Sequence, residues 1–522
     1  MSWRAEIEEI HRRRKLAEAC GGEEAVARHH AAGKMTVRER IDALLDAGTF
    51  REVGKLAGRA AYDRSGKLVS FEPAPYVMGI GKIDGRAIAI GGEDYTIRAG
   101  TGFGADRRKG GQGGFIEDLA FEYRIPLVNL IDGTGGTVNT ARRKGFTVVP
   151  GYGQDGCERS ADLLGVVPVV CAVMGTTAGG PSMRAILAHW SIMVKDTAQI
   201  FAAGPPVVER AFGQKLDKNE LGGTKVAVDT AGTIDNIARD EADCLDQIRR
   251  FLAYMPQNVW ELTPRRVSGD PVDRCEDTLA DIVPRSGRAA YNMKQLLELV
   301  VDRGSFFEVQ PTYGRAVVTA LARMDGYVVG IVANNPMFGG IVDYKAARKQ
   351  THFVELCDMF NIPLLLFADV PGLMVGVESE SDAILREGVR ARFVGFQVSV
   401  PVFTILVRKC YGVAGGGMID RRGLNFKIAW PSGNWGSLPI EGGVKAAYRR
   451  EIDAAPDPQA REREIEEELR QLASPFRTAE AFAIEDLIDP RETRPYLCQF
   501  IEALQPRLRT QTGPKAKLGV RP

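Results

Sequence analysis

The sequence predicts an α/β protein built from two similar domains in tandem, and three observations predict it. Apolar runs that fit buried strands alternate with segments of helical periodicity. Several of these segments recur in the same order between 233 and 241 positions later in the chain. A stretch rich in proline and poor in periodic apolar positions separates the two copies. We expect domains over residues 1–262 and 285–522, with a linker over residues 263–284.

The clearest recurrence is a helix, a buried strand and a glycine turn. Residues 115–136 carry this order, and residues 352–372 repeat it. Pro126 precedes the first strand, and Pro363 precedes the second strand 237 positions later. Self-similarity at a fixed offset is the sign of an internal duplication.

Two further pairs of segments support the duplication. A hairpin-like segment over residues 77–94 is matched by residues 318–335, at an offset of 241 positions. Residues 165–180, an apolar run that ends in glycines, are matched by residues 398–417 at an offset of 233 positions. Because these strands are apolar along their whole length, we expect mostly parallel sheets that are buried on both faces.

Near the C-terminus, residues 448–472 predict a different kind of element. The segment breaks at Pro456 and Pro458 and then becomes highly charged. Opposite charges spaced three or four residues apart indicate a solvated helix with ion pairs along its surface.

Composition excludes several classes of protein. Lys and Arg number 68 against 67 Asp and Glu, so the chain lacks the overall positive field of a nucleic-acid binder. No apolar stretch approaches the roughly 18 residues of a membrane span. The first residues lack the apolar core of a secretory signal. The eight cysteines form no CxxC pair, which favours reduced thiols and a cytoplasmic location.

Histidine and serine patterns exclude two kinds of catalytic site. The five histidines form no HxxxH or HExxH motif, so we expect no metal site in this chain. The nucleophile elbow GxSxG does not occur, which argues against a serine hydrolase of that type.

Two glycine-rich turns are the best candidates for chemistry. Residues 175–180 and residues 411–417 each follow a buried strand and are expected to open a helix. The first turn of a helix offers backbone N–H groups without partners, and glycine lets a ligand approach them closely. Such a turn suits a phosphate or an oxyanion, although glycines also serve simply to make a tight joint between strand and helix.

Two other glycine signals are less specific. Residues 151–156 match GxGxxG, but a short apolar run precedes them and no acidic residue follows at the expected distance of about twenty residues. Residues 100–114 combine glycines with three basic residues but lack the P-loop pattern. With the basic residues 142–144 they supply cations for a polyphosphate, or they form solvated loops.

The chain resembles the carboxyltransferase β subunits of biotin-dependent acyl-CoA carboxylases of the propionyl-, methylcrotonyl- and geranyl-CoA types. The resemblance covers most of the chain and rests on long segments that occur in the family's order. These are GKMTVRERIDALLDAGTF (33–50), VKDTAQIFAAGPPVV (194–208), ELGGTKVAVDTAGTID (220–235), VGIVANNPM (329–337), CDMFNIPLLLFADVPG (357–372) and IDPRETRPYL (488–497).

This resemblance implies two tandem crotonase-like domains (ββα-superhelix) and a site in each. In the first domain, the backbone amides of Gly179 and Gly180 would hold the enolate oxygen of an acyl-CoA thioester. In the second, the amides of Val413 and Ala414 would face the ureido oxygen of biotin. The family's motifs also place other residues near the two ligands: Ala178, Gly135, Gly136, Arg142 and Arg143 on the coenzyme A side, and Gly412, Gly372, Met374 and Gly376 on the biotin side.

The implied reaction moves a carboxyl group from carboxybiotin to the α-carbon, or the vinylogous γ-carbon, of an acyl-CoA. It needs no acidic or basic side chain, because backbone amides in two oxyanion holes stabilise the enolates. The sequence has no AMKM-like biotinyl lysine. The implied partners are therefore a biotin carboxylase and a biotin carboxyl carrier, as an α subunit or as separate chains. Relatives form homohexamers, so the resemblance implies a homohexameric β core.

The sequence departs from the family pattern at three places. Residues 132–138 read DGTGGTV where the family has DSGGARI, and the loop at residues 372–376 is closer to the methylcrotonyl- and geranyl-CoA types. Gly416 stands where relatives carry a larger side chain, which predicts a roomier acyl pocket.

Three other functions stay open at this stage. The first is a biotin-dependent decarboxylase subunit, which runs the same half-reaction backwards. The second is a crotonase-type hydratase or thioesterase without biotin, which would use a carboxylate at the thioester, with Glu93, Asp94, Asp132 and Asp155 as candidates. The third is a non-catalytic scaffold that retains the fold.

Overall fold

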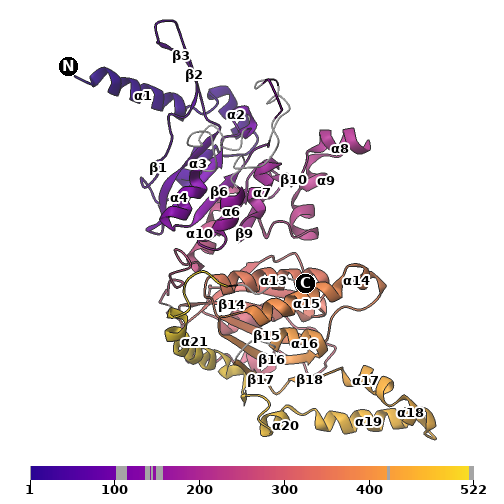
Figure 1. Ribbon diagram of the computed structural model, residues 1–522. Coiled ribbons are helices and arrows are strands. Elements are labelled where there is room, and N and C mark those ends of the chain that lie inside the picture. The colour runs from indigo at the N-terminus through magenta and orange to yellow at the C-terminus, as the bar shows by residue number, and fades with distance from the viewer. Residues whose placement is uncertain are drawn as a thin grey trace. The chain divides into compact units, whose positions relative to one another are not determined.

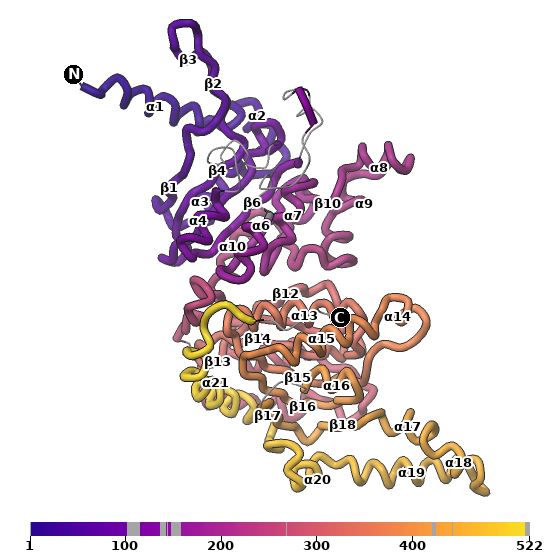
Figure 2. Tube along the Cα trace, viewed as in Figure 1, coloured from indigo at the N-terminus to yellow at the C-terminus, as the bar shows by residue number. Residues whose placement is uncertain are grey.

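A computed structural model describes residues 2–101, 115–135, 142, 145–147, 157–267, 269–419 and 424–516. The chain folds as two compact units, Met1–Val259 and Trp260–Pro522 (Figures 1 and 2). The proline-rich stretch predicted as a linker falls in the second unit. There Arg274 forms an ion pair with Asp270 and donates hydrogen bonds to the carbonyls of Leu299 and Val301. The domain bounds inferred from composition stay a prediction.

The first unit contains helices and strands in alternation. Its helices are α1 (Arg4–Glu18), α2 (Glu23–Ala31), α3 (Val37–Leu44), η1 (Arg98–Gly100), α4 (Phe115–Tyr123), α6 (Cys157–Leu163), α7 (Gly180–Ile186), α8 (Pro205–Phe212), α9 (Lys218–Gly222), η4 (Lys225–Thr230) and α10 (Glu241–Tyr254). Its strands are β1 (Arg51–Glu52), β2 (Gly58–Tyr62), β3 (Leu68–Pro73), β4 (Tyr76–Ile83), β5 (Arg86–Glu93), β6 (Leu127–Ile131), β7 (Val169–Val173), β8 (Thr176–Ala178), β9 (Trp190–Val194), β10 (Gln199–Phe201) and β11 (Asn236–Ala238).

A sheet with the strand order β1-β4-β5-β6-β7-β9-β11 forms the centre of this unit. The hairpin β4–β5 is antiparallel, and from β5 onward the neighbours run parallel. Every residue of β6, β7 and β9 is buried, as the continuous apolar runs predict. A separate hairpin, β2–β3, lies beside α1 and away from the sheet (Figures 1 and 2).

The second unit repeats this plan of alternating helices and strands. Its helices are α11 (Thr278–Asp281), α12 (Met293–Val300), η5 (Pro336–Phe338), α13 (Tyr344–Met359), α14 (Val377–Ser381), α15 (Ile384–Gln397), α16 (Gly412–Ile419), α17 (Ile440–Ala447), α18 (Arg449–Ala454), α19 (Pro458–Leu472), α20 (Pro475–Glu480), η6 (Pro490–Glu492) and α21 (Thr493–Arg509). Its strands are β12 (Phe307–Val309), β13 (Val317–Met324), β14 (Tyr327–Asn334), β15 (Leu364–Val370), β16 (Val402–Tyr411), β17 (Asn425–Ala429), β18 (Asn434–Gly436) and β19 (Asp486–Leu487).

The second sheet has the order β12-β13-β14-β15-β16-β17-β19, with β18 paired to the end of β16. Again a hairpin, β13–β14, is antiparallel and the following neighbours are parallel. Helices α13 and α15 lie side by side next to this sheet (Figure 1). The core is apolar and includes the fully buried Trp430, whose indole nitrogen donates to the Thr493 hydroxyl.

Strand register confirms the internal duplication predicted from the sequence. In the first unit Ala89 pairs with Leu127, and in the second Gly330 pairs with Leu364. These positions are offset by 241 and 237 residues, as in the sequence comparison. The next ladder continues the match, because Leu127 pairs with Val169 and Leu364 pairs with Val402, at offsets of 237 and 233 residues. The repeated segments therefore occupy equivalent strands of two similar sheets.

The charged segment near the C-terminus also folds as predicted. Helix α19 begins at Pro458, and Asp457 caps it by accepting a hydrogen bond from the amide of Ala460. Ion pairs one turn apart run along the helix, including Arg461 with Glu464. In the described part of the chain, no helix combines the length and the apolarity that crossing a membrane requires.

Candidate active site

The first glycine-rich turn lies where β8 ends and α7 begins. Gly179 has φ 67° and ψ −128°, a backbone conformation that L side chains rarely adopt. Gly180 starts the helix and is followed by Pro181, a residue type favoured in the first turn of helices. Helix α7 itself supplies no acceptor for the amides of Gly179 and Gly180, because the first N–H groups of a helix have no partner within it.

A second loop packs against this turn. Thr134 forms an isolated parallel bridge with Ala178, and the amide of Ala178 donates to the carbonyl of Gly133 over 3.4 Å. A Cβ atom at Gly135 would lie 3.0 Å from the Ala178 carbonyl oxygen and 3.2 Å from the Gly180 nitrogen. The structure thus brings together Gly135 and the predicted turn.

The other residues predicted on the coenzyme A side are not brought together by the described part of the chain. Arg142 is exposed. Gly136 and Arg143 lie outside the described residues, as do most of the glycine-rich basic stretch 100–114 and the GxGxxG motif at 151–156. The assignment of a coenzyme A contact to these residues stays a prediction.

The second glycine-rich turn lies between β16 and α16. Gly412 has φ 58°, and a Cβ atom there would lie 3.1 Å from the carbonyl oxygen of Ser437. Val413 and Ala414 follow in the first turn of α16, where the helix provides no partner for their N–H groups. The side chain of Val413 is 49% exposed, whereas Ala414 is buried.

The strand registers also show how the two turns correspond. Strand β8 pairs with β10, and the equivalent end of β16 pairs with β18; Thr176 and Lys409 begin the matching stretches, 233 positions apart. At this offset Gly412 corresponds to Gly179, and Val413 corresponds to Gly180. The family resemblance assigns the biotin side to Val413 and Ala414. The strand register assigns the equivalent positions to Gly412 and Val413. Val413 is therefore the one residue that both assignments include.

The loop predicted to contact biotin starts from the neighbouring strand end. Val370 of β15 pairs with Cys410 of β16, so Gly372 and Gly412 each lie two residues beyond a paired position. Hydrogen bonds with Val342 hold the loop at both sides, because Val342 donates to the carbonyl of Gly372 and accepts from the amide of Met374.

Two features shape the end of this loop. Gly376 has φ 113° and precedes the short helix α14, whose Ser379 hydroxyl donates to the carbonyl of Met374. The Met374 side chain is 39% exposed. The structure therefore brings Gly372, Met374 and Gly376 to the same end of the sheet as the Gly412 turn.

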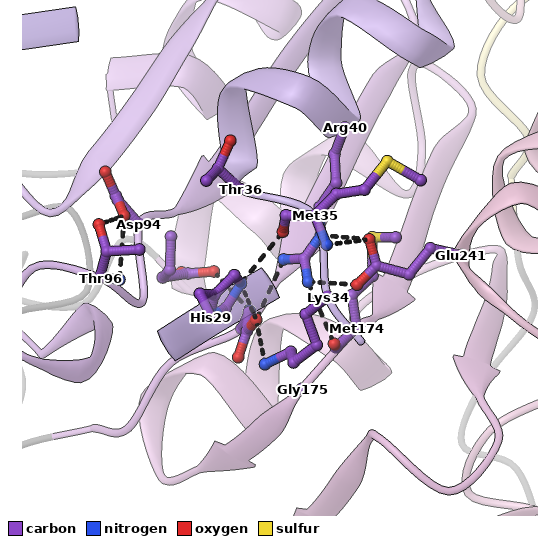
Figure 3. A network of polar contacts seen from close by, with 12 residues as sticks. His29, Lys34, Met35, Thr36, Arg40, Asp94, Thr96, Met174, Gly175 and Glu241 are labelled. Atoms are coloured by element: carbon purple, nitrogen blue, oxygen red, sulfur yellow. Dashed lines mark hydrogen bonds and ion pairs between the residues drawn. The ribbon is translucent and has the colours of Figure 1, made fainter. Parts of the chain in front are cut away.

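A buried polar network lies behind the first turn (Figure 3). Asp132, which is fully buried, follows β6 and pairs with Lys34 Nζ at 2.6 Å and Arg40 Nη1 at 3.1 Å. Arg40 also pairs with Glu241 and donates to the carbonyl of Met174. The network therefore contains two cations and two anions, which compensate one another in an interior where an unpaired charge is costly.

A second buried pair lies behind the second turn. The carboxylate of Asp369 on β15 accepts hydrogen bonds from Arg408 Nε, from the Tyr291 hydroxyl at 2.9 Å and from the backbone amide of Lys409 at 3.1 Å. Burial beside Asp369 raises the pKa of Tyr291 well above its usual value, so its hydroxyl keeps the proton that it donates.

Sequence reasoning missed Lys34, Arg40, Asp369 and Arg408. One signal was present, because Asp369 lies 237 positions after Asp132, the offset of the duplicated strands. No local pattern marks the cations, which lie far from the aspartates in the chain.

The carboxylates considered as bases for a biotin-independent reaction have structural partners. Glu93 is buried and pairs with Arg184 at 3.1 Å, and burial raises its pKa. Asp94 accepts hydrogen bonds from the amide and hydroxyl of Thr96 (Figure 3), and Asp132 is held in the network above. Asp155 lies outside the described residues. Side chains engaged in this way suit holding roles better than proton transfer.

Comparison with known proteins places the chain in a family. Residues 28–518 match the model of the carboxyl transferase domain. A propionyl-CoA carboxylase carboxyltransferase subunit of Haloferax mediterranei is 34% identical over 518 residues, with 99% of each chain covered. A methylmalonyl-CoA decarboxylase subunit alpha of Veillonella parvula is 30% identical, covering 98% of this chain and 97% of that protein.

Solved structures agree with this assignment. A crystal structure of transcarboxylase 12S, described as a hexamer assembly with methylmalonyl-coenzyme A and methylmalonic acid bound, superimposes with a TM-score of 0.89. It is 30% identical and covers 100% of this chain and 99% of that one. The two-domain crotonase-like α/β fold is thereby confirmed. The chain belongs to the carboxyl transferase domain family and is a carboxyltransferase.

Proposed function

We propose that this carboxyltransferase moves a carboxyl group from carboxybiotin, held on a separate carrier chain or domain, to the α-carbon or vinylogous γ-carbon of an acyl-CoA. The observation that carries the proposal is the pair of equivalent glycine turns at the ends of β8 and β16. Each turn offers two adjacent backbone amides at the start of a helix, and the two lie at corresponding positions of a duplicated fold. We call each turn and the loop beside it a half-site: the Gly179 turn is the acyl-CoA half-site, and the Gly412 turn is the biotin half-site. Two half-sites of similar shape suit a reaction in which negative charge develops on an oxygen atom of each of two substrates.

Each turn has a role in this reaction. The amides of Gly179 and Gly180 bind the thioester oxygen of the acyl-CoA and stabilise the charge that develops there when the α-proton is lost. The amides of Val413 and Ala414 face the ureido oxygen of biotin. Carboxybiotin supplies the carboxyl group. No side-chain acid or base is required, which fits the engagement of Glu93, Asp94 and Asp132 elsewhere.

Backbone geometry supports the fit of both turns to such groups. Gly179 and Gly412 both have positive φ, a conformation that favours glycine, and the missing Cβ atom leaves space beside the following amides. At Gly412 that space is bounded by the Ser437 carbonyl, and at Gly179 by the Cα atom of Gly135 at 3.5 Å. A side chain at either position would fill the cradle that the substrate oxygen occupies.

A decarboxylase subunit is the second candidate, and one observation favours it. The Veillonella decarboxylase subunit is nearly as similar to this chain as the Haloferax carboxylase subunit. Both directions use the same half-sites, so the partner chains decide between them. For carboxylation these are a biotin carboxylase and a biotin carboxyl carrier. The hexameric assembly of transcarboxylase 12S supports a homohexameric core for this chain.

The experiment replaces the backbone amide of Val413 and leaves the rest of the turn in place. Proline removes the N–H, and the first turn of a helix accepts proline without loss of a helix-internal hydrogen bond. We expect Val413→Pro to lower kcat for carboxyl transfer about 10²–10³-fold, the usual cost of losing one oxyanion donor. Transfer is followed with an acyl-CoA panel in the presence of the carrier chain.

Val413→Ala is the matched control, because it keeps the amide and removes only a half-exposed side chain. It should retain activity within about twofold of the wild type. Equal activity of the proline and alanine variants, both folded, would overturn the assignment of this amide. Absence of transfer by the wild-type chain on every acyl-CoA tested would overturn the proposed function itself.

A further inference from the structure

The two buried aspartates occupy equivalent positions in the duplicated fold. Asp132 follows β6, and Asp369 lies near the end of β15, 237 positions later. In both units the backbone amide of the aspartate donates to the last side chain of the preceding hairpin. Asp132 donates to Glu93 Oε2 over 3.3 Å, and Asp369 donates to Asn334 Oδ1 over 3.2 Å. Glu93 and Asn334 are themselves 241 positions apart, which is the offset of their strands.

In the first unit, the carboxylate of Asp132 ties together the ends of two adjacent strands. It binds Arg40, which donates from Nη2 to the carbonyl of Met174 at the end of β7 over 3.3 Å. It also binds Lys34, whose Nζ lies 2.4 Å from where a Cβ atom of Gly175 would be. Asp132 directly precedes the loop that packs on the turn at Gly179, and Gly175 directly precedes β8. The network therefore fixes both segments that form the first turn.

In the second unit, the carboxylate of Asp369 also ties together the ends of two adjacent strands, β15 and β16, but through different partners. Its Oδ1 accepts the amide of Lys409, three residues before Gly412, over 3.1 Å. Its Oδ2 accepts from Arg408 and Tyr291, and Arg408 in turn donates to the carbonyl of Ala289 over 2.8 Å. Asp369 also lies three residues before Gly372, at the start of the loop predicted to contact biotin. One carboxylate thereby fixes both segments of the second half-site.

Both carboxylates are charge-compensated and almost fully buried, at 0% and 2% exposure. A buried ion pair of this kind adds little net stability over well-packed apolar groups, so its retention in both copies points to a role other than stability. Each carboxylate acts on backbone groups at the carboxyl end of its sheet, where the glycine turns begin.

We propose that Asp132 and Asp369 are positioning residues, Asp132 for the acyl-CoA half-site and Asp369 for the biotin half-site. Neither contacts the reacting atoms. Each aspartate fixes the ends of neighbouring strands, so that the backbone amides that follow them are oriented toward the same ligand oxygen. This inference rests on the proposed function, and its test separates the two half-sites. Misplacing a catalytic group by about 1 Å can cost about 10²-fold in rate.

The test uses the full chain in the reverse reaction, with methylmalonyl-CoA as carboxyl donor and free biotin as acceptor. The carboxyl group leaves the α-carbon of the thioester and bonds to the ureido nitrogen, and the proton of that nitrogen passes to the α-carbon. We expect Asp132→Asn to raise KM for methylmalonyl-CoA at least tenfold and to leave KM for biotin within about twofold. We expect Asp369→Asn to raise KM for biotin at least tenfold and to leave KM for methylmalonyl-CoA within about twofold.

A binding measurement gives a readout that does not depend on turnover. Isothermal titration with methylmalonyl-CoA alone should show at least tenfold weaker binding for Asp132→Asn and an unchanged dissociation constant for Asp369→Asn. Asp132→Glu and Asp369→Glu keep the charge but lengthen the side chain, and they should show the same split if the asparagine variants fail to fold.

Two buried aspartates at the opposite ends of the strands serve as matched controls. Asp235 accepts from the amide of Ser191 near the start of β9, and Asp358 accepts from the amide of Ser399 just before β16. Asp235→Asn and Asp358→Asn should lower stability without changing either KM. Asp132 and Asp369 variants that fold and keep the wild-type kcat and both wild-type KM values would overturn the positioning role. No transfer by the wild type from methylmalonyl-CoA or from any other carboxylated acyl-CoA tested would instead overturn the proposed function.

Discussion

Gly175 shows at the scale of one residue how tightly the first half-site is packed. A Cβ atom at this position would lie 1.8 Å from Asp132 Oδ1 and 2.3 Å from its Cγ. A separation this short requires the buried carboxylate, its cations or the backbone to shift. We therefore expect Gly175→Ala to lower the free energy of unfolding by about 3 kcal/mol, at the upper end of the usual cost of overpacking. Denaturant unfolding followed by circular dichroism measures the change.

Gly442→Ala is the control for this substitution. Gly442 lies exposed in α17, and nothing lies within 4 Å of the position of its Cβ. Alanine is the better helix former, and Gly442 lies in the first turn of α17, so this variant should be as stable as the wild type or more stable. Equal unfolding midpoints for Gly175→Ala and Gly442→Ala would show that the Asp132 network rearranges at little energetic cost, contrary to its proposed positioning role.

Lys349 gives the stability of the protein a predictable dependence on pH. Its amine is buried in α13, its Nζ donates to the carbonyl of Tyr313 over 3.1 Å, and burial lowers its pKa to about 7. In the unfolded chain the pKa of a lysine is about 10.4. Between these values the unfolded state binds more protons, so the free energy of unfolding rises with pH. Below pH 7 the amine is charged in both states, and the cost of burying that charge is paid in full.

Lys349→Met removes the titrating group and keeps a side chain of similar length. Relative to this variant, the wild type should gain up to about 1.4 kcal/mol of stability per pH unit between pH 7.5 and 9.5. Denaturant unfolding of both proteins at several pH values gives the slope. Parallel stability profiles across that range would mean that the folded chain keeps the amine charged and solvated.

At the scale of elements, the sequence was most informative where strands are buried on both faces. The apolar runs at β6, β7, β15 and β16 predict strands because no alternation with polar residues is needed there. The offsets between repeated prolines and glycines equal the offsets of the observed registers. Both glycine turns could also be predicted, because a run of glycines directly after a buried strand is typical of a tight turn into a helix.

Other elements could not be predicted because they depend on contacts between distant segments. Strand β8 has three residues and exists only by pairing with β10, and β18 likewise pairs with the last residues of β16. Arg40 binds Asp132 across 92 positions and Glu241 across 201 positions, and neither contact leaves a local pattern. The positioning networks are therefore visible only once the fold brings their members together.

At the scale of the whole molecule, duplication accounts for the two half-sites of the proposed function, one for each of two chemically different substrates. Both units place a glycine turn at the carboxyl end of the same strand and a buried aspartate beneath it. The cations differ: Lys34 and Arg40 lie on the segment before the first sheet, whereas Arg408 lies within β16. Both units thus share the glycine turn, while the cations that pair with the aspartate beneath it differ.

The proposed reaction needs a carrier that brings the carboxyl group, and the sequence contains no AMKM-like biotinyl lysine. We expect a biotinylated chain to co-purify when the protein is isolated from its own cells under gentle lysis. Streptavidin blotting of the purified complex, beside an unrelated tagged protein as control, detects it. A biotin carboxylase among the partners would establish carboxylation, and a membrane-bound sodium pump would establish decarboxylation. If a folded preparation binds no biotinyl chain even when candidate carriers are added, a biotin-independent crotonase-type enzyme or a scaffold becomes the better description.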